Sequence, residues 1–167
     1  LHAQSQAPER VWRIGILRPS APPLPNDPTS TGIPSALREI GYVEGRNLVL
    51  EHRYASGNLE QLVPLARELA SARVDLVVAV SAGAVRAARE VSSGWPIVMF
   101  GNFDPVALGL VASLARPGGN VTGVLIAPDG TLAGKRLELL RQVVPGATRI
   151  GYLSPPPDAS SAQQLAE

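Results

Sequence analysis

The feature that most constrains the fold of this chain is a nearly continuous apolar run from Val74 to Val80, interrupted only by Asp75. A short run of this kind, rich in valine, is typical of a central parallel strand that is buried on both faces. Neighbouring parallel strands need long crossover connections, which are usually helices. The run therefore predicts an α/β fold in which strands alternate with helices.

The rest of the chain shows this alternation. Besides 74–80, apolar runs predict strands at 11–17, 47–54, 96–100, 121–126 and 148–153. Amphipathic spacing and capping residues predict helices at 31–40, 59–71, 81–91, 105–114 and 131–144. Strict alternation predicts a doubly wound parallel sheet with helices on both faces. In such folds ligands bind beyond the carboxyl ends of the strands.

Composition excludes several classes of protein. Apolar residues make up 45% of the chain and charged residues 17%, which argues against disorder. The net charge is +1 and no stretch concentrates basic residues, so we expect no nucleic-acid partner. No apolar run approaches the roughly 20 residues of a membrane span. Cysteine is absent and the histidines are His2 and His52, so we expect no metal site of the Cys or His type, and no cofactor.

The strongest candidate site follows the run 74–80, at Ser81, Ala82 and Gly83. A strand that ends in serine and opens into a helix presents a hydroxyl and free backbone amides at a positive helix end. This arrangement suits a carboxylate. The alternative is a plain serine N-cap followed by small residues that allow close packing.

Two further segments follow strands. In Gly101–Pro105, Asp104 is a candidate acceptor for a ligand ammonium or hydroxyl group, and Phe103 is a candidate stacking surface. The alternative is an N-cap, because Asp followed by Pro is a common helix start. In the proline-rich loop after the first strand, Ser20 is a candidate donor to a ligand; the alternative is a loop that is only a proline-stiffened connection. Arg18 is able to pair with an anion, but a lone exposed arginine is more often a solvated side chain.

Enzyme signatures are missing. No G-x-G-x-x-G follows the first strand, and neither a Walker A sequence nor G-x-S-x-G is present. Ser81 has no suitable histidine partner, since His2 lies in the N-terminal tail and His52 within the second strand. Asp75 stands near the start of its strand, at the wrong end for an active site. We therefore predict that the chain is not an enzyme.

Three stretches together resemble the family of ABC transporter substrate-binding proteins, whose characterised relatives include aromatic amino-acid binders. The matching stretches are 36–47 (ALREIGYVEGRN), 110–123 (LVASLARPGGNVTG) and 134–140 (GKRLELL). The resemblance implies the N-terminal lobe of a type I periplasmic-binding-protein fold. It also implies ligand contacts at Ser20, Ser81, Ala82 and Asp104. Relatives often carry a Gly-Thr-Pro type sequence where this chain has Ser81-Ala82-Gly83.

Family members run to roughly twice this length as two domains. We therefore expect three parts: a disordered or post-signal tail (1–12), an N-terminal ligand-binding lobe (13–147) and the start of a truncated second lobe (148–167). The tail is either what remains after removal of an export signal or an ordinary frayed end. An exposed face between lobes would also favour homodimer formation.

The resemblance implies an extracytoplasmic, periplasmic component of an ABC importer. Such a protein traps a small solute, here an amino acid or related carboxylate, between two lobes and presents it to a membrane permease. Two alternatives share the fold class. A ligand-sensing domain of a regulator or receptor would be indicated by a helix-turn-helix segment before residue 13, and none is visible. A flavodoxin-like enzyme or phosphoacceptor domain would need acidic residues clustered after the first strand, where only Asp27 stands.

Overall fold

The computed structural model describes residues 10–24, 32–126 and 131–151, with side chains described from residue 134 onward in the last range. Five parallel strands form one sheet in the order β2-β1-β3-β4-β5. The strands are β1 (Trp12–Arg18), β2 (Leu48–Tyr54), β3 (Leu76–Val80), β4 (Ile97–Gly101) and β5 (Val121–Leu125). The predicted parallel sheet is confirmed.

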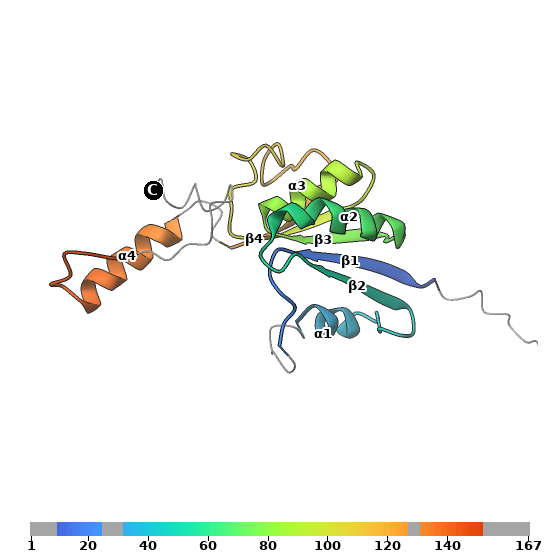
Figure 1. Cartoon of the computed structure of the whole chain (residues 1–167), viewed down its shortest axis with the longest axis horizontal. Coiled ribbons are helices and arrows are strands. Elements are labelled where there is room, and N and C mark those ends of the chain that lie inside the picture. Colours follow the sequence, from blue (N-terminus) through green and yellow to red (C-terminus); the bar gives the residue numbers. More distant parts are fainter. Residues whose placement is uncertain (1–9, 25–31, 127–130, 152–167) are drawn as a thin grey trace, which may run out of the picture.

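Helices cover both faces of this sheet, as a doubly wound fold requires. The helix α1 (Gly32–Glu39) lies on one face, and α2 (Leu62–Ser71) and α3 (Ala82–Val91) lie on the other (Figure 1). A short 3-10 helix, η2 (Leu59–Gln61), precedes α2. Pro64 accounts for this division, because proline has no amide hydrogen and fits only in the first turn of an α-helix. The helix therefore begins at Leu62 rather than at residue 59.

The two faces of the sheet bury two separate apolar clusters. The larger one lies beneath α2 and α3 and includes Leu69, Val85 and Ile97. The smaller one lies beneath α1 and contains four buried strand residues, Ile14, Ile16, Leu48 and Leu50. Side chains of β3 alternate between them, which is why its sequence is apolar at nearly every position.

The β4–β5 pair depends on one close backbone approach. A Cβ atom at Gly123 would lie 2.0 Å from the carbonyl oxygen of Met99, its register partner in β4. The φ angle of Gly123 is +157°, in a region that side-chain-bearing residues rarely adopt. This glycine is therefore a requirement of strand pairing at the β5 edge.

The helix predicted at 105–114 is wrong. Residues 105–109 form turns instead, in which the Leu110 amide donates to the carbonyl of Pro105 at 2.8 Å. Gly109 has a φ of +66°, which ends any helical path. The apolar residues Leu110 and Val111 still enter the larger core, so burial is achieved without a helix.

The helix predicted at 131–144 forms as α4 (Thr131–Val143), but it extends away from the sheet (Figure 1). Its apolar stripe is exposed: Leu137, Leu140 and Val144 are 49%, 38% and 48% accessible. Residues 148–151, the described part of the strand predicted at 148–153, form no strand; residues 152 and 153 lie outside the described ranges. None of the described helices is long and apolar enough to cross a membrane.

Candidate functional site

The strand order places the candidate site between β1 and β3. The chain passes from β1 to β2 on one side of this pair and to β3 on the other, so β1 and β3 flank the switch in strand order. In folds of this kind ligands bind in a crevice beyond the carboxyl ends of the strands at this switch. The register pairs Leu17 with Ala79, so Arg18 lies beside Val80, one residue before Ser81. The ends of β1 and β3 therefore flank the point at which this fold binds ligands.

Ser81 has the most unusual backbone at this edge. Its φ and ψ angles are 97° and 158°, a region populated almost entirely by glycine, and such a conformation costs about 1–3 kcal/mol. Its Oγ atom accepts a hydrogen bond from the Ala84 amide at 3.3 Å, which confirms the predicted N-cap of α3. The hydroxyl hydrogen is left for a second acceptor, and the amides of Ala82 and Gly83 have no acceptor within the helix.

Phe103 does not line the strand edge. It is 5% exposed and belongs to the larger core, where its ring would lie 2.9 Å from a Cβ at Gly101. Gly101, the last residue of β4, has a φ of +156°. Phe100, which is 43% exposed, is the aromatic residue left accessible near the end of β4.

Asp104 caps the turn that follows it. Its Oδ1 atom accepts hydrogen bonds from the amides of Val106 (2.8 Å) and Ala107 (3.0 Å), so its capping role holds although no helix follows. Oδ2 has no partner among the described residues and is the oxygen left for a ligand.

Ser20 lies on an exposed loop that backbone hydrogen bonds hold against the end of β2. Its carbonyl accepts from the Ser56 amide at 3.2 Å, and the carbonyl of Pro19 accepts from the Gly57 amide at 2.8 Å. This loop is therefore anchored at its start, and the Ser20 backbone is held beside the end of β2.

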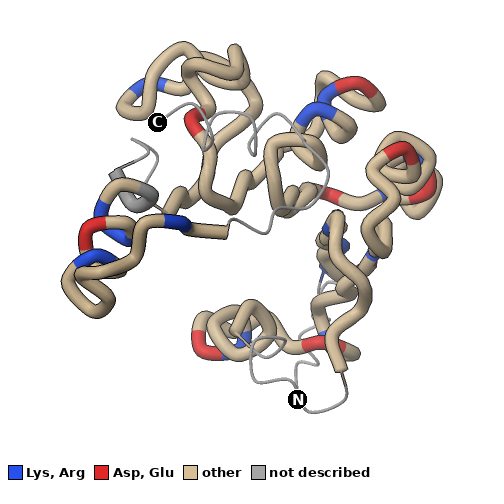
Figure 2. Tube along the Cα trace, turned by 60° about the vertical axis from the view of Figure 1, so that its left-hand side comes forward, with Lys and Arg blue, Asp and Glu red and all other residues tan. Residues whose placement is uncertain are grey.

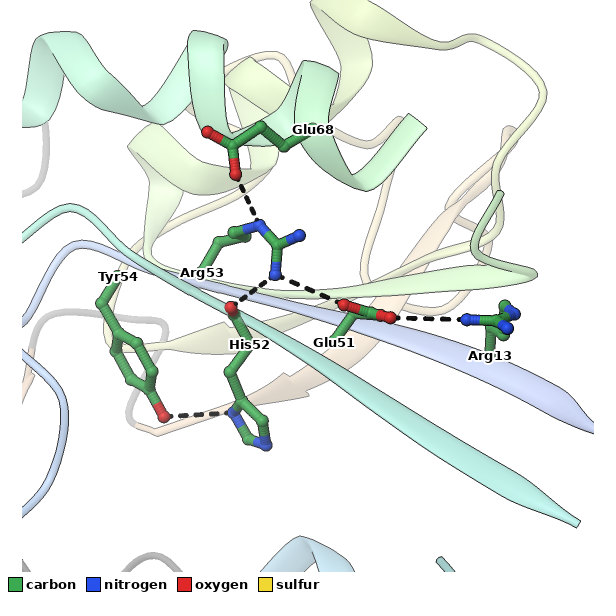
Figure 3. Close-up of polar contacts among 6 residues, drawn as sticks. All are labelled: Arg13, Glu51, His52, Arg53, Tyr54 and Glu68. Atoms are coloured by element: carbon green, nitrogen blue, oxygen red, sulfur yellow. Dashed lines mark hydrogen bonds and ion pairs between the residues drawn. The ribbon is translucent and has the colours of Figure 1, made fainter. Parts of the chain in front are cut away.

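Sequence reasoning missed an aromatic pair beside Arg18. The rings of His52 and Tyr54 are stacked, with their centroids 5.8 Å apart and an angle of 4° between their planes. The Tyr54 hydroxyl lies 3.1 Å from Nδ1 of His52 (Figure 3). Burial lowers the pKa of His52, and the Arg18 charge lowers it further, while Glu44 and Glu51 oppose the shift. The signal was present in β2, where His52 and Tyr54 continue the period-two pattern of Leu48 and Leu50.

The opposite face of β2 carries ion pairs that serve structure. Arg53 Nε donates to Glu68 of α2 at 2.7 Å, and Glu51 lies 3.4 Å from both Arg53 and Arg13 (Figure 3). These contacts join the edge strand to its neighbour and to α2. Along the described part of the trace, acidic and basic residues are interspersed (Figure 2). Among the described residues no group of three or more His, Cys, Asp or Glu could hold a metal ion.

A model of the family described as "ABC transporter substrate binding protein" matches residues 24–167. The chain belongs to this family. The predicted resemblance is thereby confirmed, over most of the length that was expected. The tyrosine-binding protein of Clostridioides difficile (strain R20291) is 32% identical over 139 residues, which cover 83% of this chain and 39% of that protein.

Solved structures agree on the fold. A conserved domain protein from Vibrio cholerae matches with a TM-score of 0.72 at 28% identity, over 82% of this chain and 45% of its own. A ligand-free, open substrate-binding protein with adhesive properties from Clostridium difficile matches with a TM-score of 0.65 at 32% identity, over 93% of this chain and 52% of its own. An ABC domain from Streptococcus pneumonia in complex with L-Trp matches with a TM-score of 0.68 at 26% identity, over 81% of this chain and 44% of its own. The chain thus spans about half the length of these structures, as one lobe does.

Proposed function

We propose that this chain forms the first lobe of an extracytoplasmic solute-binding protein of an ABC importer. The observation that carries the proposal is the strained Ser81 at the β1–β3 crevice, next to the free amides that open α3. Strain of this kind persists where function requires it and the surrounding structure compensates for it. The small solute is an α-amino acid, and aromatic amino acids are the first choice, because relatives are named for tyrosine or hold L-Trp.

Each end of an amino acid has a complementary group at this edge. The Ser81 hydroxyl and the amides of Ala82 and Gly83 suit its carboxylate, because a helix N-terminus carries partial positive charge. The free Oδ2 of Asp104 suits its ammonium group. Ser20, on the loop anchored at its start to the end of β2, would donate a hydrogen bond to the carboxylate.

The second lobe would supply the opposing wall and exclude water when the two lobes close. We place its beginning at α4 rather than at residue 148, since α4 leaves the sheet and exposes its leucines. An exposed leucine stripe on an amphipathic helix indicates a packing partner elsewhere. The closed form would then present the solute to the membrane permease.

The test is a thermal-shift and calorimetric screen against amino acids, sugars and small carboxylates, on this chain and on a two-lobed form. We expect aromatic amino acids to stabilise both, and the two-lobed form more strongly. Stabilisation of the two-lobed form by none of the amino acids would overturn the proposed ligand class. Stabilisation by a nucleotide would overturn the proposed function itself.

A further inference from the structure

Arg18, the last residue of β1, is only partly exposed. Its Nε atom is buried and has no hydrogen-bond partner among the residues that the structure describes. Within residues 10–24, 32–126 and 134–151, its side chain pairs with no carboxylate. A buried donor without an acceptor costs free energy, and the cost is larger for a charged group. An anionic partner from outside the chain would remove this cost.

The neighbours of Arg18 strengthen this reading. Tyr54 is its register partner in β2, and His52 lies on the same face two residues earlier. The stacked rings of this pair point to the face away from the Arg53–Glu68 ion pair (Figure 3). The Arg18 charge lowers the pKa of His52, so its field reaches the pair despite the opposing Glu44 and Glu51.

Arg18 also stands at the correct place in the fold. It lies beside Val80 across the β1–β3 pair, immediately before Ser81 and the amides of α3. A planar guanidinium presents parallel N–H donors that match the two oxygens of a carboxylate. We propose that Arg18 is the charged anchor for the ligand carboxylate and sets the specificity of the crevice for acids over their neutral analogues. This inference rests on the proposed function for the identity of the solute.

The first arm of the test compares L-tyrosine with L-tyrosinamide, which lacks only the carboxylate charge. By calorimetry we expect the native chain to prefer the acid by about 10- to 100-fold. Arg18→Gln should lose most of this preference, although Ser81 and the amides that open α3 still favour the carboxylate, and Arg18→Lys should keep a larger part of it. Arg67→Gln, which removes an exposed charge from α2, is the matched control and should behave as the native chain. Full preference retained in Arg18→Gln would overturn the proposal.

The second arm does not depend on the solute. The pKa of His52 is followed by NMR while acetate replaces chloride at constant ionic strength, and His52→Gln assigns the resonance. Acetate bound at Arg18 should raise the pKa of His52, because it cancels a charge that lowers it. In Arg18→Gln that pKa should already be higher and should not respond. If tyrosine fails to bind but acetate produces this response, the proposed solute fails and the Arg18 anchor stands; no response in the native chain would overturn the anchor.

Discussion

The Oδ2 atom of Asp75 accepts a hydrogen bond from the backbone amide of Arg13 at 2.8 Å, which joins the amino-terminal ends of β3 and β1. Its Oδ1 atom accepts from the Arg10 guanidinium at 2.7 Å, and that guanidinium lies 3.7 Å above the Trp12 ring. The one charged residue in the most apolar run of the sequence is thus a structural tie, at the edge opposite the candidate site.

This tie predicts a pH-dependent stability. The Arg13 amide, with help from Arg10, lowers the pKa of Asp75 below 3.8. The carboxylate therefore stabilises the fold fully above the unfolded value, and this stability is lost as the pH falls through the folded pKa. We expect Asp75→Asn to reduce the free energy of unfolding by about 1–2 kcal/mol at neutral pH. Urea denaturation should show the difference shrinking in acid.

Glu60→Gln, on the exposed 3-10 helix, is the control for Asp75→Asn and should change little at any pH. Parallel stability curves for Asp75→Asn and the native chain down to low pH would contradict the assigned role of the Asp75 charge.

The strained backbone of Ser81 predicts that two small substitutions differ in stability. Ser81→Ala removes the N-cap and keeps the strained backbone, so it should cost about 1 kcal/mol or more. Ser81→Gly also removes the hydroxyl but relieves the strain, so it should be more stable than Ser81→Ala by about 1 kcal/mol. Both should weaken amino-acid binding. Thermal unfolding checks the order, and an alanine variant as stable as the glycine variant would refute the strain.

Gly123 predicts that strand pairing at the β5 edge is intolerant of a single methyl group. Gly123→Ala would place its Cβ 2.0 Å from the Met99 carbonyl oxygen, so β4 and β5 would have to separate. We expect a loss of about 3 kcal/mol or more in the free energy of unfolding. Gly119→Ala, whose Cβ would meet no atom within 4 Å, should stay within about 0.5 kcal/mol in the same urea titration.

Two leucines test whether α4 belongs to the sheet-bearing lobe. Leu69 of α2 is fully buried, so Leu69→Ala should cost about 2–5 kcal/mol. Leu140 of α4 is 38% exposed, so Leu140→Ala should change the free energy of unfolding by less than about 0.5 kcal/mol. A large loss for Leu140→Ala would show that α4 packs on the lobe in solution.

Much of the fold could be predicted because it depends on patterns that are local along the chain. Apolar runs and capping residues located each strand and helix of the sheet-bearing unit to within a few residues. The error at 105–114 has a physical reason: its apolar residues do enter the core, but Gly109 and the Asp104 cap make turns rather than a helix. The apolar pattern of this segment correctly predicts which residues are buried, but it does not predict the backbone conformation.

The candidate site was harder to predict. Ser81 was found because a serine before small residues is a local capping signal. Phe103 was predicted to be a stacking surface but is buried in the larger core, whereas Phe100 is accessible, and no local pattern in the sequence encodes this difference. For Arg18 the sequence left anion pairing open and favoured a solvated side chain, because the burial of its Nε depends on residues distant in sequence.

By itself the sequence determined the class of fold, the family and the loops that carry the candidate site residues, since these follow from periodicity, capping and matching stretches. Only the tertiary structure decided the strand order, which places the switch between β1 and β3, and which of the candidate side chains are buried. It also separated α4 from the sheet, although its apolar stripe looks like that of any buried helix. Amphipathic spacing shows that a face needs a partner, whereas contacts between distant segments decide which partner covers it.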